Sequence, residues 1–485
     1  MLDIVADPER CYRAVSSRDA RFDGWFVTAV HSTKIYCRPS CPARLPRFEG
    51  VTFYANPAAA QNGGYRACKR CRPDASPGSP EWDIRADLAA RAMRLIGDGV
   101  VDREGVSGLA SRLGYTSRHL TRVLSEELGA GPLAVARAQR AQTARLLLET
   151  TDVSVTEVAY ASGFASLRQF NDTIREIFAT TPTALRQRRR TREIAEPGTV
   201  NLRLTYRQPC DLAATLNFLR LRAVPGVEAG DGDGFVRALD LPHGTGTVRL
   251  SEGPPGAGYA RASLALSDLR DLTVAVARCR RLLDLDADPV AVDAVLGSGP
   301  LAGHVAARPG LRVPGTVDGA ELAIRAVLGQ QISVAGARTL AGRLSATYGR
   351  ALPAPCGDVT HTFARTDELA KADPADLPMP ASRARALIEL CGALAVGDLV
   401  LDGSAERSDV EHRLLAMRGI GPWTAGYIRM RALRDPDVWL GTDLEIVKAL
   451  ARLSAAAAAA GPVDSAQWSP WRSYAVLQLW SGGPA

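Results

Sequence analysis

The chain has 485 residues, which is too long for a single hydrophobic core, so three or four domains are expected. Its 46% hydrophobic and 23% charged residues are typical of a soluble globular protein, and it has no run of about 18 uncharged apolar residues that could span a membrane. The net charge of +7 is uneven, because residues 1–192 contain 29 Lys and Arg against 20 Asp and Glu, whereas residues 193–485 contain 30 against 32. A basic first part suits a polyanionic partner.

The first residues and the cysteines indicate the compartment. Residues 1–11 carry three acidic residues and no apolar run, unlike a secretory signal. Four of the nine cysteines cluster at short spacings and the others are scattered, which favours a metal site in a reducing compartment over a disulfide framework. We therefore expect a cytoplasmic protein with no membrane partner.

Two short-spaced cysteine pairs form the first motif. Cys37 and Cys41 are four residues apart, and Cys68 and Cys71 follow with a spacing of three. Such pairs suit a tetrahedral Zn²⁺ site with four thiolate ligands. The spacing alone fits a purely structural zinc ribbon as well as a reactive zinc centre.

The segments around these cysteines carry a family resemblance. Residues 24–27, 35–41, 53–56 and 64–74 closely resemble the N-terminal domain of the bacterial adaptive-response (Ada) proteins. The resemblance implies that all four cysteines bind one zinc ion. It also implies that Cys37 is the nucleophile that takes a methyl group from a methylphosphotriester in DNA.

Zinc would give this acceptor a chemical advantage. Bound Zn²⁺ keeps a thiol deprotonated at neutral pH, and the thiolate is the nucleophile. Methylating one of four thiolates removes one negative charge near phosphate, so the reaction can act as an electrostatic switch. The transfer is expected to be stoichiometric, since no base in the site removes a methyl group from a thioether. The basic residues expected to contact the DNA backbone are Arg38, Arg44, Arg47, Arg66, Lys69, Arg70 and Arg72.

A linker and a helical repeat come next. Residues 72–80 are rich in Pro, Gly and Ser, which indicates a linker, and a helical pattern follows from about residue 82. Residues 109–124 and 158–170 repeat one another, each with the order helix, glycine turn, helix. Ser166 with Gln169 three residues later predicts a capping box at the second helix of the second unit.

This double helix-turn-helix resembles the AraC-type DNA-binding domain, over about residues 82–190, although a generic helical bundle remains the alternative. The resemblance implies a transcription regulator that binds promoter DNA, with RNA polymerase as a further expected partner. Arginine suits guanine edges, and Gln or Asn suits adenine. The candidates for groove contact are Arg118, His119, Arg122, Arg168, Gln169 and Asn171.

A small α+β unit is expected after about residue 199. Its predicted strands are separated by glycine-rich turns such as residues 230–234, and its predicted helices lie near residues 211–221 and 267–285. From about residue 288 the pattern is mostly helical. The strands are expected at residues 200–206, 235–241, 248–250 and 259–266.

The strongest catalytic motif lies in this helical part. Residues 414–425 contain Gly419 and Gly421 between two helical stretches, the pattern of a helix-hairpin-helix. The glycines let the backbone approach DNA closely, and the N–H groups at the start of the second helix can bind a phosphate. Asp443 follows 22 residues after Gly421. A glycine hairpin alone would also fit an ordinary helical hairpin.

With residues 323–334 and 468–475, these features resemble the helix-hairpin-helix DNA glycosylase superfamily, in its alkylpurine branch (AlkA-like, 3-methyladenine glycosylase II), over about residues 199–484. The resemblance implies that Asp443 stabilises an oxocarbenium-like sugar after base flipping. It places Trp423, Tyr427 and Trp480 in an aromatic pocket for the cationic base. Bifunctional members have Lys at the position of Trp423, so a monofunctional hydrolase is expected.

The chain departs from this branch at two positions. The pocket aromatic that directly follows the catalytic Asp is Leu444 here, and the Leu that fills the gap left by the flipped base corresponds to Gln331. These differences bear on the substrate range and on the wedge that enters the duplex. Gln331, Gly419 and Gly421 are the residues of this half expected to contact DNA.

Taken as a whole, the sequence predicts a mainly α multidomain protein for DNA-alkylation repair and response. Its C-terminal half lacks the Pro-Cys-His-Arg active site of the O6-methylguanine methyltransferases, so that repair is not expected. One alternative is a transcription regulator with a structural zinc site and a catalytically weak glycosylase-like half. The expected domains are a small α+β zinc methyl-acceptor domain (1–78), an all-α double helix-turn-helix domain (82–190), an α+β domain with an antiparallel sheet (199–286) and an all-α helix-hairpin-helix glycosylase catalytic domain (287–485).

Overall fold

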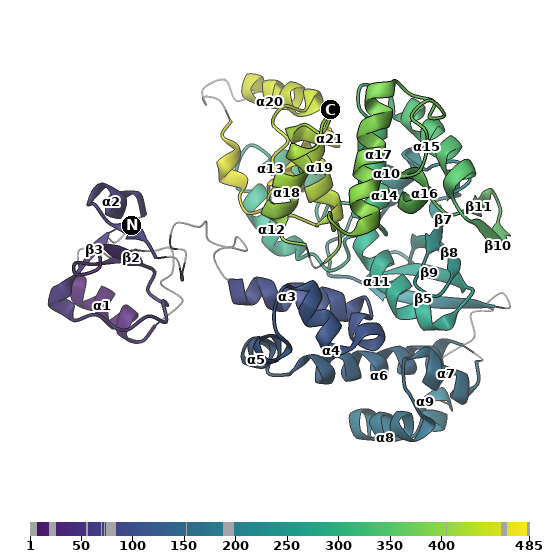
Figure 1. Ribbon diagram of the computed structural model, residues 1–485, viewed down its shortest axis with the longest axis horizontal. Coiled ribbons are helices and arrows are strands. Elements are labelled where there is room, and N and C mark those ends of the chain that lie inside the picture. The colour runs from purple at the N-terminus through teal and green to yellow at the C-terminus, as the bar shows by residue number, and fades with distance from the viewer. Residues whose placement is uncertain are drawn as a thin grey trace. The chain divides into compact units, whose positions relative to one another are not determined.

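The structure is a computed structural model, which describes residues 7–18, 26–54, 57–68, 70–71, 73, 84–151, 153–187, 198–403, 405–456 and 463–482 (Figure 1). The chain divides into two compact units. The first contains Met1–Ala90 and Val123–Gly129, and the second contains Arg91–Arg122 and Ala130–Ala485. Apart from Pro73, the linker predicted at residues 72–80 lies outside the described residues, and so do Lys69 and Arg72.

The N-terminal domain is a small α+β fold, as predicted. Its four-stranded sheet has the order β3-β1-β2-β4, in which β1 pairs antiparallel with β2 and β3, and β2 pairs parallel with β4. Phe26 and Phe53 pack edge to face against one another in a small apolar cluster with the buried Cys11, and Tyr36 is fully buried in a second small cluster. The elements are α1 (Pro8–Ser16), β1 (Val27–Val30), β2 (Ile35–Cys37), η3 (Phe48–Gly50), β3 (Val51–Tyr54), α2 (Pro57–Asn62) and β4 (Arg66–Ala67).

Seven helices form the double helix-turn-helix domain. The turn glycines Gly114 and Gly163 have φ values of 75° and 83°, in the left-handed region that favours glycine, so the sequence repeat is a structural repeat. The helices are α3 (Ile84–Gly97), α4 (Val100–Arg112), α5 (Ser117–Leu128), α6 (Pro132–Thr150), α7 (Val155–Ala161), α8 (Leu167–Phe178) and α9 (Pro182–Gln187).

Side-chain caps define where the two helices of the second helix-turn-helix unit begin. Helix α7 begins with a complete capping box between Ser154 and Glu157, which the sequence analysis missed. At α8, the Ser166 hydroxyl accepts the Gln169 backbone N–H at 3.2 Å, which is one half of the predicted box. Both caps satisfy backbone donors that a helix start leaves unpaired.

The next domain is built on a five-stranded antiparallel sheet of order β5-β9-β8-β7-β6. The four predicted strands are present, with β8 longer than expected. The fifth strand, β6, was missed because its Gly230 and Asp231 were assigned to a glycine-rich turn. The elements are β5 (Thr199–Thr205), α10 (Leu212–Leu221), β6 (Glu228–Asp231), β7 (Gly234–Asp240), β8 (Thr245–Glu252), β9 (Tyr259–Leu266), η4 (Leu269–Asp271) and α11 (Leu272–Leu282).

The C-terminal domain is helical, as predicted, except for a short hairpin of β10 (Ala351–Cys356) and β11 (Val359–His361) that the sequence analysis missed. None of the described helices is long and apolar enough to cross a membrane. The helices are α12 (Pro289–Leu296), α13 (Ala302–Ala307), α14 (Gly319–Leu328), α15 (Val334–Tyr348), α16 (Thr366–Leu369), α17 (Ala381–Val396), α18 (Arg407–Ala416), α19 (Pro422–Ala432), α20 (Leu444–Ala456), η5 (Ser465–Trp468) and α21 (Arg472–Trp480).

Inside the second unit, the helix-turn-helix domain packs against the five-stranded sheet domain. Buried side chains of α6, α7 and α8 share one apolar cluster with those of β5, α10 and α11. Asp98 accepts two hydrogen bonds of 2.7 Å from Arg281, and the hydroxyls of Thr143 and Thr273 lie 3.0 Å apart. These contacts join the two domains through a common core.

Candidate functional sites

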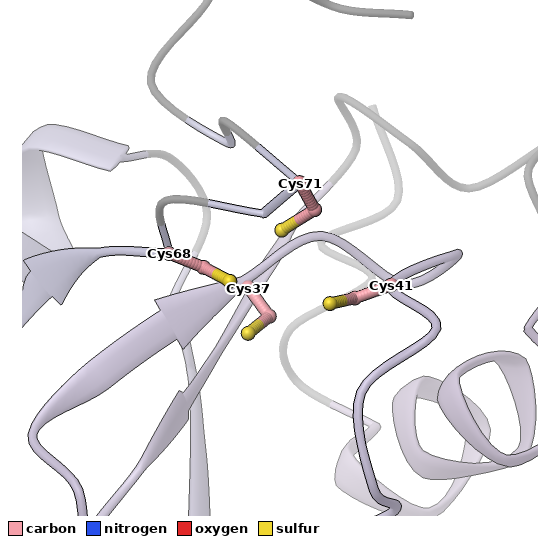
Figure 2. A group of neighbouring side chains, drawn as sticks. All are labelled: Cys37, Cys41, Cys68 and Cys71. Carbon is pink, nitrogen blue, oxygen red and sulfur yellow. The ribbon is translucent and has the colours of Figure 1, made fainter. Parts of the chain in front are cut away.

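The four clustered cysteines come together at one end of the N-terminal sheet (Figure 2). Cys37 is the last residue of β2, and Cys68 directly follows β4, its parallel neighbour. The Cys68 backbone N–H donates to the Tyr36 carbonyl at 3.0 Å, which holds the two chain segments side by side. Cys41 and Cys71 lie on the loops that follow, and all four sulfur atoms are within 4.8 Å of one another.

This donor set fits a zinc ion. A tetrahedral Zn²⁺ with Zn–S bonds of ~2.3 Å needs sulfur atoms about 3.8 Å apart, which is compatible with four sulfur atoms that all lie within 4.8 Å of one another. The hydrogen bond between Cys37 and Cys41 raises the pKa of Cys37 and lowers that of Cys41. Four thiolates side by side repel one another, so a positive ion at their centre is needed to hold all of them deprotonated.

A cavity of about 260 Å³ opens beside three of these cysteines. Cys37, Cys41 and Cys68 line it, whereas Cys71 does not. Cys37 is half-buried, while Cys68 and Cys71 are buried. The cavity wall also carries basic and aliphatic side chains, among them Arg18, Arg38, Arg44, Val30, Ile35 and Leu45. It thus combines positive charge, which suits phosphate, with an apolar surface beside a sulfur.

The helix-turn-helix candidates divide by exposure. Arg118 and Arg122 on α5 are exposed, as are Arg168 and Gln169 on α8. His119 is half-buried, because its ring stacks on Tyr115 at 5.0 Å. Asn171 is half-buried as well. The four exposed residues therefore remain the candidates for base or phosphate contact.

The predicted helix-hairpin-helix is formed by α18, the residues 417–421 and α19. Gly419 has a φ of 86°, which favours glycine, and Gly421 is the exposed N-cap residue of α19. Pro422 occupies the first turn of α19 and has no N–H to leave unpaired. The start of α19 is accordingly an exposed helix N-terminus of the kind that binds phosphate.

Asp443 lies at the mouth of a cavity and not in open solvent. Its carboxylate accepts the indole N–H of Trp423 at 2.9 Å and that of Trp480 at 3.1 Å. It also accepts the backbone N–H groups of Glu445 and Ile446, at 3.0 and 3.2 Å, at the start of α20. Four N–H donors therefore fix the position and orientation of this half-buried carboxylate.

Aromatic rings line the cavity behind this acid. Trp423 and Tyr427 stack with their ring centroids 5.2 Å apart and an interplanar angle of 8°, and Tyr427 lies 6.3 Å from Trp480. The cavity has a volume of about 360 Å³, within the range of small-molecule sites. The structure thus brings together Asp443 and the three aromatic residues that the sequence singled out.

Three basic residues of the same cavity were not predicted from the sequence. Arg222 at the C-cap of α10, Arg325 on α14 and Arg431 on α19 all line it, as does Phe218. Arg325 is paired with Glu228 and Glu321, which are both buried. No sequence signal joins these residues, because α10 belongs to the sheet domain and meets α19 only in the folded protein.

The two residues that depart from the glycosylase pattern lie outside the cavity wall. Leu444 is 64% exposed at the start of α20. Gln331 is exposed in the turn between α14 and α15, with a φ of 59°. Its neighbour Gln330 donates to the Gly419 carbonyl at 2.9 Å and to the Thr424 hydroxyl at 3.1 Å, which fixes this turn beside the helix-hairpin-helix.

Comparisons with known proteins agree with this architecture. The metal-binding domain of Ada matches residues 10–74, a helix-turn-helix domain matches residues 109–188, and the AlkA N-terminal domain matches residues 201–318. The chain is 34% identical over 286 residues to DNA-3-methyladenine glycosylase 2 of Escherichia coli, covering 57% of this chain and 95% of that protein. It is 31% identical over 230 residues to the bifunctional transcriptional activator/DNA repair enzyme Ada of the same bacterium, covering 47% and 60%.

The fold and its sites define a multidomain protein of DNA repair and transcription regulation. Over 480 residues the chain is 53% identical to the probable bifunctional transcriptional activator/DNA repair enzyme AlkA of Mycobacterium tuberculosis, covering 98% of this chain and 96% of that protein. The chain therefore belongs to the AlkA family of bifunctional transcriptional activator/DNA repair enzymes. The resemblances to Ada-type, AraC-type and AlkA-like domains are confirmed.

Proposed function

We propose that this chain is a monofunctional DNA glycosylase for alkylated purines of the 3-methyladenine type, fused to a zinc methyl acceptor and a promoter-binding domain. The observation that best supports glycosylase activity is the position of the Asp443 carboxylate. Two pocket tryptophans and a helix N-terminus hold it at the mouth of an aromatic cavity. The name of the 34% identical glycosylase supports the lesion class.

The chemistry follows from this carboxylate. A base flipped from the duplex enters the cavity and stacks on Trp423 and Tyr427, whose faces attract a cationic ring. As the glycosidic bond lengthens, positive charge develops on the sugar, and Asp443 stabilises it without prior reorganisation. Water then completes the hydrolysis. Trp423 stands where an amine nucleophile would be needed, so no Schiff base forms and the product is an abasic site.

DNA contacts of the glycosylase half come from two neighbouring turns. The exposed N–H groups at Gly421 bind a backbone phosphate, and the hairpin around Gly419 approaches the sugar–phosphate chain. Gln331, on the adjacent turn, enters the gap that the flipped base leaves. Its amide can pair with the orphaned base, which a leucine at this position could not do.

Asp443→Asn tests the glycosylase. The substitution keeps the shape and removes the charge, so release of 7-methylguanine from a defined duplex should fall at least about 100-fold. Glu445→Gln, which removes a neighbouring cavity-lining carboxylate, serves as the matched control and should release the base nearly as well as the native protein. If Asp443→Asn released the base at the native rate, the chain would be a regulator whose glycosylase half only binds DNA.

We propose further that the N-terminal domain binds one zinc ion through Cys37, Cys41, Cys68 and Cys71, and that Cys37 accepts a methyl group from a DNA methylphosphotriester. Zinc supplies the positive charge that keeps the sulfur a thiolate. Arg38 and Arg44 attract the flanking phosphates, and the apolar side of the cavity receives the methyl group. The S–CH₃ bond forms as the O–CH₃ bond breaks, which leaves an ordinary phosphodiester.

Peptide mass spectrometry after incubation with methylphosphotriester DNA tests the methyl acceptor. The peptide that contains Cys37 should gain the mass of one methyl group, and the peptides of the other three cysteines should not. Cys37→Ser should abolish the mark. An unmarked Cys37 in the native, zinc-loaded protein would favour a structural zinc site.

The helix-turn-helix domain is assigned to promoter binding through Arg118, Arg122, Arg168 and Gln169, with RNA polymerase as the partner in activation. Loss of negative charge at the methylated zinc centre reduces repulsion from DNA, which would strengthen promoter binding. Electrophoretic mobility shifts with the methylated and unmethylated protein test this link. Equal promoter affinities of the two forms would show that methyl transfer does not regulate promoter binding.

A further inference from the structure

Two neighbouring helices of the glycosylase half, α14 and α19, lie side by side and run in opposite directions. Gln330, which follows α14, donates to the Gly419 carbonyl and to the Thr424 hydroxyl near the start of α19. At the other end of the pair, Arg431 near the end of α19 donates to the Gly315 carbonyl, which precedes α14. With 10 and 11 residues, each helix is about 15 Å long.

The DNA contacts proposed for the glycosylase lie at one end of this helix pair. Gly421 is the exposed N-cap residue of α19, and the exposed Gln331 follows the C-terminal end of α14. The cavity that Asp443 lines takes Gly329 and Trp423 from the same end of the two helices. A damaged duplex therefore meets the C-terminal end of α14 and the N-terminal end of α19.

The helix-turn-helix domain packs against the opposite end of the pair. A cavity of about 170 Å³ between the two domains is lined on one side by residues of α3 and α4. On its other side lie Gly319, the first residue of α14, and Leu433, the C-cap residue of α19. Arg112 of α4 forms an ion pair of 3.7 Å with Asp402 beside the same cavity. The docked domain is thus about one helix length away from the DNA-binding turns.

This docking leaves the DNA-reading residues of the helix-turn-helix domain uncovered. Phe170 and Ile174 of α8 belong to the apolar cluster that this domain shares with β5, so the buried face of α8 points toward the sheet domain. The Arg168 side chain is 91% exposed, and Gln169 and Arg118 are exposed as well. The glycosylase half therefore does not block the surface proposed to bind promoter DNA.

A single short duplex does not reach both surfaces. The persistence length of DNA is about 150 base pairs, so a segment as short as a binding site stays nearly straight. A straight duplex that contacts Gly421 and Gln331 runs across one end of α14 and α19, whereas the helix-turn-helix domain lies at the other end. The two surfaces are therefore placed for two separate segments of DNA.

We propose that one copy of this chain holds two DNA duplexes at once, a regulatory site on the helix-turn-helix domain and a damaged duplex at the cavity beside Asp443. The residues assigned to the two surfaces do not overlap, so the two duplexes bind independently. A chain bound at a promoter continues to excise bases from a second duplex. This inference rests on the proposed glycosylase and promoter-binding functions and adds the bridging of DNA to them.

Sandwich capture on a surface tests the bridging. The attached duplex is one that the full chain selects from an undamaged random-sequence library. The second duplex is fluorescent, lacks the selected sequence and contains one pyrrolidine abasic nucleotide, whose ring cation mimics the sugar cation beside Asp443 and cannot be cleaved. The bound chain should retain one second duplex per chain. The amount of bound chain should change by less than about twofold, because independent sites have no coupling free energy.

Two controls identify the surfaces that are used. The fluorescent duplex without the pyrrolidine nucleotide should be retained at least about tenfold less, because only the analogue resembles the transition state. An excess of the selected duplex in solution should remove the chain and the second duplex from the surface together. Mass photometry of the assembled complex counts the chains for each pair of duplexes.

Three results would overturn the inference. The second duplex could displace the chain from the surface or fail to be retained, and either result would mean that one duplex excludes the other. Two chains for each pair of duplexes would mean that each chain holds one duplex. In contrast, a full chain that releases no 7-methylguanine in solution would refute the proposed glycosylase function, and a library that yields no selected duplex would refute promoter binding.

Discussion

The four-cysteine site and the aromatic cavity beside Asp443 are assembled differently. The four cysteines lie within 35 residues, and one pair of parallel strands brings them together. The glycosylase cavity takes its walls from α10, α14, α15, α19 and α21, and its acid from the N-cap of α20. A local motif would suffice for the methyl transfer that we propose, because that reaction consumes its own thiolate. Repeated turnover, in contrast, requires a cavity that regenerates every group.

Metal removal should produce the largest difference in behaviour between the two regions. A structural zinc ion contributes about 10–16 kcal/mol to the folding of small domains, and the described residues of the N-terminal domain form two small apolar clusters to offset its loss. A thiol-competing chelator should unfold the N-terminal domain and abolish methyl transfer to Cys37, while 7-methylguanine release continues. Circular dichroism and both activity assays measure this. Loss of base release on chelation would show that the regions depend on one another.

Removal of an indole N–H donor from the cavity should have the next largest effect. Trp480→Phe removes the N–H group that Trp480 donates to Asp443 and keeps an aromatic ring. A hydrogen bond to a charged group contributes about 1.5–3 kcal/mol, so the rate of base release should fall about 10- to 100-fold. Trp439→Phe is the matched control, because Trp439 packs against Trp468 and does not line the cavity. Equal effects of both variants would argue against a special role for the bonds to Asp443.

The same contrast explains which features could be predicted from the sequence. The cysteine spacing, the turn glycines Gly114 and Gly163, and the hairpin around Gly419 are local patterns, and the structure has each of them in place. Asp443 and Trp480 could be singled out only through the family resemblance. The sequence spacing places both residues after the hairpin but does not bring their side chains together.

Long-range contacts set the limit of prediction. Arg222 and Arg431 are separated by more than 200 residues, and each would be read from the sequence as a solvated helix residue. Strand β6 was missed for a different reason. Its Gly230 and Asp231 favour a turn locally, and pairing with Phe235 and Gly234 of β7 overrides that preference. Neither of the two sequence segments contains a pattern that predicts the packing of α6 against β5.

That docking leads to a third prediction. Cleavage between residues 190 and 199 would free the helix-turn-helix domain from the glycosylase half, yet the two share an apolar cluster. A fragment that begins at residue 198 should still release 7-methylguanine, because every cavity residue is retained. Its melting temperature should be several degrees lower than that of the full chain, since the face of β5 and α11 loses its cover. Loss of base release in a folded fragment would refute this modular interpretation.

The smallest effect should come from the ion pair that joins these domains. The side chains of Asp98 and Arg281 are 14% and 20% exposed, so the pair lies between a surface bridge and a buried one, and Asp98→Ala should cost about 1 kcal/mol. Asp172→Ala, which breaks the exposed pair with Arg168, should cost almost nothing. Thermal unfolding followed by calorimetry compares them. If the domains unfold as one unit, Asp98→Ala shifts the whole transition of residues 91–485. A shift confined to a separate helix-turn-helix transition would mean that the shared core does not couple the promoter-binding domain to the glycosylase.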